Sequence, residues 1–143
     1  MYENEDEVGE AIRAKIDDGT ITREDIWITT KLWDNFHNPK DVKRALDMSL
    51  KNLGVDYVDL YLVHWPIDYK DGDNMFPKDE NGKPIFAYHD KIDVWKFRHI
   101  KLFHAMEELV DLGLSKTIGL SNFNKRQIER ILANCRIKPA NNQ

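Results

Sequence analysis

The sequence predicts an α/β protein in which about four parallel strands alternate with helices, as a partial TIM (β/α)8 barrel that is incomplete at both ends. Helix-like and strand-like patterns alternate along all 143 residues. The strand-like runs are short and mostly apolar, as in parallel strands that helices cover on both faces. Polar side chains of chemically useful types follow these runs, where the carboxyl ends of parallel strands meet.

The first segment, residues 4–19, predicts a helix. Its apolar residues fall at helical spacing, at Val8, Ala11, Ile12 and Ile16. Asn4 can cap this helix together with Glu7 three residues later, and Gly19 can end it. Tyr2 then lies just before the helix, where a preceding strand would finish.

The next two segments predict a strand and a helix. Residues 26–33 are apolar and β-branched, which is typical of a buried strand. Asn38 is a suitable cap for the following helix, Pro39 fits its first position, and Gly54 can end it. An apolar stripe runs between them at helical spacing, through Val42, Ala45, Leu46, Leu50 and Leu53.

A second strand is predicted at residues 58–63, and a long connection over residues 66–91 follows it. The connection is rich in Pro, Gly, Asp, Asn and Lys, and its length predicts an excursion over a functional face. A helical pattern then resumes through Trp95, Leu102, Met106, Leu109 and Val110, and closes at Gly113.

The last segments repeat the alternation. The run KTIGLSNF predicts a third strand that ends in a turn, and Asn124 with Gln127 can cap the helix after it. The tail IKPANNQ begins a fourth strand. No linker, repeat or low-complexity segment interrupts the series, so we expect residues 1–143 to form a single partial domain.

Two closures of such a sheet compete, an open doubly wound sheet and a barrel. An open sheet that binds a nucleotide usually carries a glycine-rich phosphate motif, and neither GxGxxG nor GxxxxGK[ST] is present. This favours a barrel. A whole barrel needs eight units and roughly 250 residues, so this chain corresponds to an interior slice of one.

Composition excludes several classes of protein. A net charge of -4 with 32% charged residues argues against disorder and against nucleic-acid binding. The only cysteine, Cys135, suits a reducing compartment, and the sequence has neither an 18-residue apolar run nor a cationic leader. We expect a cytoplasmic protein with no nucleic-acid or membrane partner, and the sequence predicts no metal site.

Polar and aromatic residues of particular types follow the predicted strands. They are Tyr2, Lys31, Trp33, His64, Trp65, Ser121, Asn122 and Gln143. Taken singly, each has an ordinary explanation, such as a solvated lysine, a hydrogen-bonded core histidine or a turn. Their joint placement on one rim favours a site, with the two tryptophans as walls of an apolar pocket.

The residue types favour the reduction of a carbonyl group. A phenol has an ordinary pKa of about 10, so Tyr2 needs a cation such as Lys31 beside it to act as an acid. A neutral His64 can donate a hydrogen bond to a carbonyl oxygen. Hydride has to come from a cofactor, because no side chain supplies it. Three residues have the donors and acceptors that hold a carboxamide such as that of nicotinamide: Ser121, Asn122 and Gln143.

Five segments resemble successive signatures of the aldo-keto reductase family, in order and across nearly all of the chain: YENEDEVGEAI, ITTKLW, LGVDYVDLYLVHWP, KTIGLSNFN and KPANNQ. The resemblance implies a (β/α)8 barrel that binds NADPH without a Rossmann fingerprint and reduces small-molecule aldehydes or ketones. It implies Tyr2 as the acid, Lys31 as its partner and His64 as the orienting group. It also implies that the full-length form is a monomer. The residues that would contact the nicotinamide are Ser121, Asn122 and Gln143, and those that would contact the substrate are Trp33 and Trp65.

The sequence departs from the family pattern at three places. The chain does not cover the family's catalytic aspartate, a few residues before the tyrosine, or the first two and last two strands. Residues 97–104 interrupt the family's run DVWKAMEEL, and our hypothesis is a shifted splice site, which the coding transcript across Lys96 to Ala105 would settle. Asn141 stands where the family usually has an apolar residue, and a buried amide without partners would cost about 1–3 kcal/mol.

The sequence leaves two functions open. The first is an NADPH-dependent reductase, of which this chain alone is expected to be inactive, because half a barrel leaves two sheet edges exposed. The alternative is a noncatalytic module that senses a cofactor or binds partners while reusing the barrel. The presence of Tyr2, Lys31 and His64 together favours the enzyme.

Overall fold

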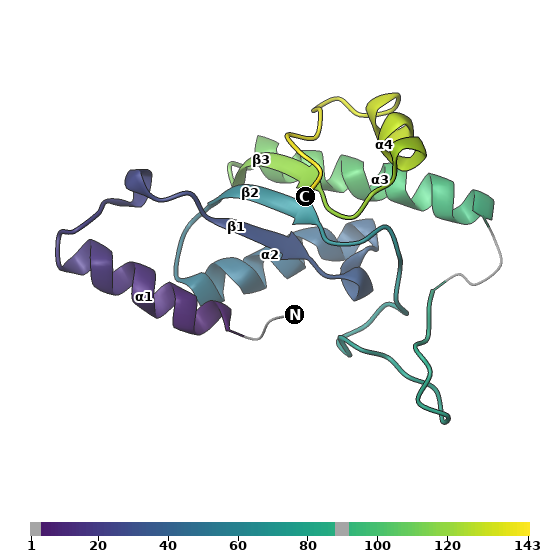
Figure 1. Cartoon of the computed structure of the whole chain (residues 1–143), viewed down its shortest axis with the longest axis horizontal. Coiled ribbons are helices and arrows are strands. Elements are labelled where there is room, and N and C mark those ends of the chain that lie inside the picture. The colour runs from purple at the N-terminus through teal and green to yellow at the C-terminus, as the bar shows by residue number, and fades with distance from the viewer. Residues whose placement is uncertain (1–3, 88–91) are drawn as a thin grey trace.

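The structure is a computed structural model, and it describes residues 4–87 and 92–143, with side chains described outside residues 88–97. A parallel sheet of three strands forms its centre, in the order β1-β2-β3 (Figure 1). The strands are β1 (Thr29–Leu32), β2 (Val58–Val63) and β3 (Ser115–Leu120). This confirms the predicted α/β class with parallel strands.

Four α-helices alternate with these strands. They are α1 (Glu5–Asp17), α2 (Pro39–Leu53), α3 (Ile92–Asp111) and α4 (Lys125–Leu132), with short 3₁₀ turns η1 (Arg23–Asp25) and η2 (Asp34–Phe36). Consecutive helices contact each other, while α2 also contacts β1 and α3 contacts β3 (Figure 1). The helices therefore form a layer along the sheet, and none in the described part of the chain is long and apolar enough to span a membrane.

The strand β2 lies at the centre of the sheet, and all six of its residues are buried. Its bounds match the predicted strand, because the run is apolar and turn-forming residues flank it. Lys31 of β1 pairs with Leu62 of β2, so that His64, just after β2, lies near the end of β1. The C-terminal ends of the strands thus meet at one edge.

Two of the three predicted N-cap residues cap their helices in the structure. Asn38 accepts a hydrogen bond from the Lys40 amide at the start of α2, and Gly54 ends the helix with a left-handed φ of 67°. Asn124 and Gln127 form a reciprocal capping box at α4. The predicted cap at Asn4 is wrong, because its backbone (φ -137°, ψ 18°) is not extended and its side chain caps nothing.

Two predicted strands differ from the structure. The first is shorter than residues 26–33, because the Ile28 amide donates to the buried Asp59 carboxylate and residue 33 leads into η2. The fourth is not a full strand, but the tail does begin to pair in parallel with β3. A bridge joins Leu120 to Asn142, and the amides of Ala140 and Gln143 donate to the carbonyl oxygens of Ile118 and Leu120. The sheet therefore has three strands where the sequence predicted about four.

The connection after β2 and the start of α3 follow the prediction in outline. Residues 66–87 form an irregular excursion from the C-terminal edge of the sheet, held by two isolated antiparallel bridges (Figure 1). Residues 97–104 continue α3 without a break, and Leu102 and Phe103 are buried in the core. The Asn141 side chain is exposed beside Gly119, so in this structure it does not carry the cost of a buried amide.

Candidate functional site

A cavity of about 520 Å³ runs along β1 between α1 and α2 and reaches the C-terminal ends of β1 and β2. Among the residues that line it are Lys31, Trp33 and His64, together with Tyr61 and Met75. The parallel pairing of β1 with β2 accounts for this, because it brings residues about 30 positions apart to the same edge. Three of the predicted site residues therefore face one space.

His64 is buried, with 5% of its surface exposed, and lies directly after β2. Its ring meets Trp33 edge-on at 5.1 Å between centroids and stacks on Trp65 at 6.4 Å. Burial, followed by the charge of Lys31, lowers the pKa of His64 from 6.5 to about 4. His64 is consequently a neutral imidazole at pH 7, which can donate one hydrogen bond and accept another.

Trp33 forms the wall of the cavity that faces the excursion. Its indole Nε1 donates to the carbonyl oxygen of Met75 at 2.8 Å. Its ring also contacts Tyr69 and Phe76, with centroids 6.0 and 5.4 Å away. The excursion therefore covers Trp33 with aromatic side chains, which makes this side of the cavity apolar.

Ser121, Asn122 and Gln143 gather at the C-terminal end of β3. Asn122 adopts a left-handed φ of 64° and donates both Nδ2 hydrogens, to the His64 carbonyl oxygen at 2.8 Å and to Ser121 Oγ at 2.9 Å. The Asn122 amide donates to the Gln143 carbonyl oxygen at 3.0 Å. This network fastens the ends of β2 and β3 together and leaves the Asn122 side-chain oxygen as the acceptor for any further partner.

The structure does not bring every predicted residue into the cavity. Ser121, Asn122 and Gln143 lie outside its lining, although Asn122 is linked to the backbone of His64. Trp65 is also outside the lining and is 41% exposed. Tyr2 lies outside the described residues. The cavity thus holds Lys31, Trp33 and His64, and the other side chains lie beside it or are not described.

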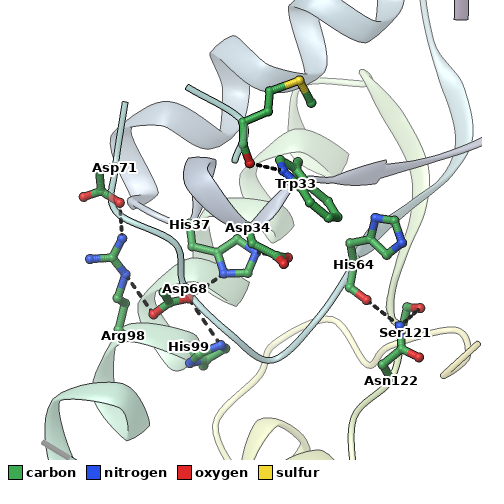
Figure 2. A network of polar contacts seen from close by, with 11 residues as sticks. Trp33, Asp34, His37, His64, Asp68, Asp71, Arg98, His99, Ser121 and Asn122 are labelled. Atoms are coloured by element: carbon green, nitrogen blue, oxygen red, sulfur yellow. Dashed lines mark hydrogen bonds and ion pairs between the residues drawn. The ribbon is translucent and has the colours of Figure 1, made fainter. Parts of the chain in front are cut away.

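Sequence reasoning missed a second group of polar side chains on the far side of Trp33 (Figure 2). We call it the Asp68 cluster; it consists of Asp34, His37, Asp68, Arg98 and His99. Four of these side chains are at most 5% exposed, the exception being the half-buried Arg98. No spacing along the chain signals the cluster, because its members come from η2, the excursion and α3.

The two aspartates of the cluster have opposite electrostatic surroundings. Burial, and then the charge of Asp68, raises the pKa of Asp34 from 3.8 to about 8. Burial also opposes ionisation of Asp68, but the hydrogen bond from His37 and the nearby cationic groups together lower its pKa below 3.8. At neutral pH, Asp34 therefore keeps its proton while Asp68 carries the negative charge.

Comparison with known proteins identifies the family to which this chain belongs. The family described as "Aldo/keto reductase family" matches residues 1–143. The chain is 52% identical over 145 aligned positions to "Estradiol 17 beta-dehydrogenase 5" of Mus musculus and 50% identical to "3-alpha-hydroxysteroid dehydrogenase" of Rattus norvegicus. Each alignment covers all of this chain but 42% of the relative, so the chain spans less than half the length of these relatives.

Solved structures agree on the fold. The aldose reductase from Schistosoma japonicum superposes with a TM-score of 0.89 at 49% identity, covering 99% of this chain and 44% of that one. The aldose reductase from Giardia lamblia gives a TM-score of 0.87 at 38% identity, with coverages of 99% and 45%. The three-stranded sheet and its helices are therefore part of a TIM barrel.

Proposed function

Because this chain belongs to the aldo/keto reductase family, we propose that the protein it represents reduces aldehydes or ketones to alcohols with hydride from NADPH. The observation that supports this most directly is the shared cavity of Lys31 and His64, with His64 neutral at pH 7. A neutral imidazole donates a hydrogen bond to a carbonyl oxygen and thereby orients it. That interaction strengthens as negative charge develops on the oxygen during reduction.

We assign proton transfer to Tyr2, supported by the charge of Lys31. A phenol donates its proton at neutral pH only where a cation stabilises the phenolate. Lys31 lies near the end of β1 on the cavity wall, so its ammonium group can supply that charge to the cavity. Trp33, edge-on to His64, and Trp65, stacked on it, supply apolar surface for the substrate.

The residues at the end of β3 fit a nicotinamide carboxamide. A carboxamide needs a donor for its oxygen and an acceptor for its nitrogen. The side-chain oxygen of Asn122 can accept, the exposed side-chain amide of Gln143 offers both kinds of atom, and the Ser121 hydroxyl is hydrogen-bonded to Asn122. NADPH supplies the hydride, and we propose that Ser121, Asn122 and Gln143 bind and orient its amide beside the cavity.

The test uses a longer version of the chain that carries the flanking segments of an aligned family member. We expect aldehyde-dependent oxidation of NADPH, and a fall in kcat of at least about a hundredfold for Tyr2→Phe, because general acid catalysis contributes roughly 10²–10⁴-fold. Tyr57→Phe is the matched control, since Tyr57 precedes β2 at the opposite end of the sheet and contacts Arg23 and Lys116. Turnover that survives Tyr2→Phe would overturn the assignment.

The same assay separates the enzyme from a noncatalytic cofactor sensor. NADPH fluorescence that is quenched without any turnover would support the sensor, while turnover supports the reductase. We propose that residues 1–143 by themselves show no measurable turnover, since they correspond to less than half of each aligned relative. The proposal further assigns the whole protein to the cytoplasm as a monomer that acts on a small carbonyl compound.

A further inference from the structure

Three potential metal ligands meet in the Asp68 cluster. His37 Nδ1 lies 2.5 Å from Asp68 Oδ1, and His99 Nε2 lies 3.6 Å from the same oxygen (Figure 2). One ligand atom from each of the three residues falls within 4.8 Å of the others. All three side chains are at most 5% exposed, so the group is enclosed by protein.

From this geometry we propose that His37, Asp68 and His99 bind one Zn²⁺ ion. Two imidazoles and a carboxylate form a ligand set that Zn²⁺ accepts, and three protein ligands leave the fourth tetrahedral position for water. Ligand distances of about 2.0–2.1 Å place tetrahedral ligand atoms about 3.4 Å apart. The separation of 3.6 Å between His99 and Asp68 already fits this value, and the contact between His37 and Asp68 has to widen by about 1 Å.

The charges around Asp68 leave its Oδ1 directed at the two histidines. Arg98 pairs with the other oxygen, with its Nε 3.2 Å from Asp68 Oδ2, and its Nη2 contacts Asp71. The guanidinium is therefore held on the opposite edge of the carboxylate, where it repels a bound cation least. Arg98 also fixes the orientation of Asp68, as hydrogen-bonded outer groups do for metal-bound carboxylates.

His37 has an acceptor near its second ring nitrogen. Asp34 Oδ1 lies 3.7 Å from His37 Nε2, and that nitrogen is buried without a hydrogen-bond partner. When Nδ1 binds a metal, the proton of neutral histidine resides on Nε2, where a carboxyl oxygen can accept it. In the metal-bound state Asp34 is consequently a positioning residue, which accepts the Nε2 proton while Nδ1 binds the metal in place of its hydrogen bond to Asp68.

The site would join three segments that are distant in the sequence. His37 follows η2, Asp68 lies near the start of the excursion, and His99 belongs to residues 97–104 of α3, so the site requires that the coding transcript includes this segment. A metal here would fasten the excursion to the helix layer next to Trp33, which contacts the excursion at Met75. The inference is independent of the proposed reductase activity, because none of the three ligands lines the cavity.

Zinc binding to the chelator-stripped chain, measured by equilibrium dialysis, tests the proposal. We expect one equivalent of Zn²⁺ to bind, and His37→Ala and His99→Ala to weaken binding by at least tenfold, because removal even of an outer partner typically costs 10–100-fold. His104→Ala is the matched control, since His104 lies on the exposed side of the same helix and contacts the Asn134 carbonyl oxygen. No stoichiometric binding, or equal losses in all three variants, would overturn the site.

A second measurement uses the unaltered chain, so that it does not depend on how the variants fold. X-ray absorption of the Zn²⁺-loaded protein should show two imidazoles and oxygen, with no sulfur shell at about 2.3 Å. A sulfur shell would instead place the ion at Cys135, and fewer than two imidazoles would also overturn the proposal. Asp34→Leu, which removes the acceptor oxygen, should weaken binding by about 10–100-fold without changing the number of imidazoles.

Discussion

His64 and His37 are two buried histidines with opposite electrostatic surroundings. His64 contacts two tryptophan rings, and the side-chain charge that acts on it most strongly is that of Lys31. His37 lies between two carboxyl groups, with Asp68 at 2.5 Å and Asp34 at 3.7 Å. Figure 2 shows these two environments on either side of Trp33.

The difference separates a chemical role from a structural one. An imidazole among aromatic rings and a cation stays neutral, so it can polarise a substrate without a charge of its own. An imidazole that is hydrogen-bonded to a buried carboxylate is held by that partner and stabilises the segments that carry the two groups. His64 is therefore suited to a reaction, and His37 to fastening η2 to the excursion.

The largest effect should come from removing the charge of Asp68. Asp68→Asn leaves Arg98 and His37 without their buried carboxylate, and breaking such a buried pair costs about 3–5 kcal/mol of unfolding free energy. Urea denaturation of the metal-free protein measures the change. Asp73→Asn is the control, because Asp73 is 88% exposed and its pair with Arg44 should contribute about 0–1 kcal/mol.

Equal losses in these two variants would remove the distinction between a structural cluster and ordinary surface ion pairs. A loss below about 1 kcal/mol for Asp68→Asn would mean that His37 is as weakly coupled to its partners as an exposed residue. The contrast between His37 and His64 would then rest only on the surroundings of His64 in the cavity.

A smaller effect should come from the titration of His64. Its pKa is about 4 in the folded protein against 6.5 ordinarily, so between these values the unfolded state binds a proton that the folded state does not. Stability is therefore present above pH 6.5 and falls as the pH decreases toward 4, by up to about 3 kcal/mol. Urea denaturation between pH 4 and 7 measures this slope.

His64→Gln should flatten the dependence of stability on pH, because the titrating group is gone. His104→Gln changes an exposed histidine and should leave the slope as it is. An unchanged slope in His64→Gln would show that His64 is not kept neutral by its surroundings, and its proposed role as a neutral donor would lose its support.

The sequence predicted the parts of this molecule that depend on local pattern. The strand β2 has five apolar residues and one aspartate between turn residues, and α2 has its own cap, stripe and terminating glycine, so both were predicted with their bounds. Lys31 and His64 could be paired because both lie at strand ends, and parallel strands bring such ends together. The first strand was predicted too long, because its true start depends on Asp59, 31 positions after Ile28.

The Asp68 cluster could not be predicted for the same physical reason. Its contacts join His37 to a residue 31 positions later and Asp68 to side chains of α3, across an excursion that has no regular periodicity. Asp34, His37 and Asp68 taken alone resemble surface loop residues, and the two members from α3 resemble ordinary polar helix positions. Only the packing of α3 against the excursion brings the three ligand atoms together.

The smallest predicted effect separates the contribution of the Lys31 charge to the pKa of His64 from the contribution of burial. Lys31→Met removes a positive charge, so the pKa of His64 should rise, by less than about one unit, since burial is the larger cause of its depression. An NMR titration of the His64 ring proton measures it, with Lys40→Met as a control that removes the same charge from an exposed position. A rise confined to Lys31→Met supports a cation close enough to act on the cavity, and therefore on a phenol bound there. If both variants leave the pKa of His64 unchanged, the charge of Lys31 does not act on His64. The proposed partnership of Lys31 with Tyr2 then loses its support, because no other measurement places the Lys31 charge in the cavity.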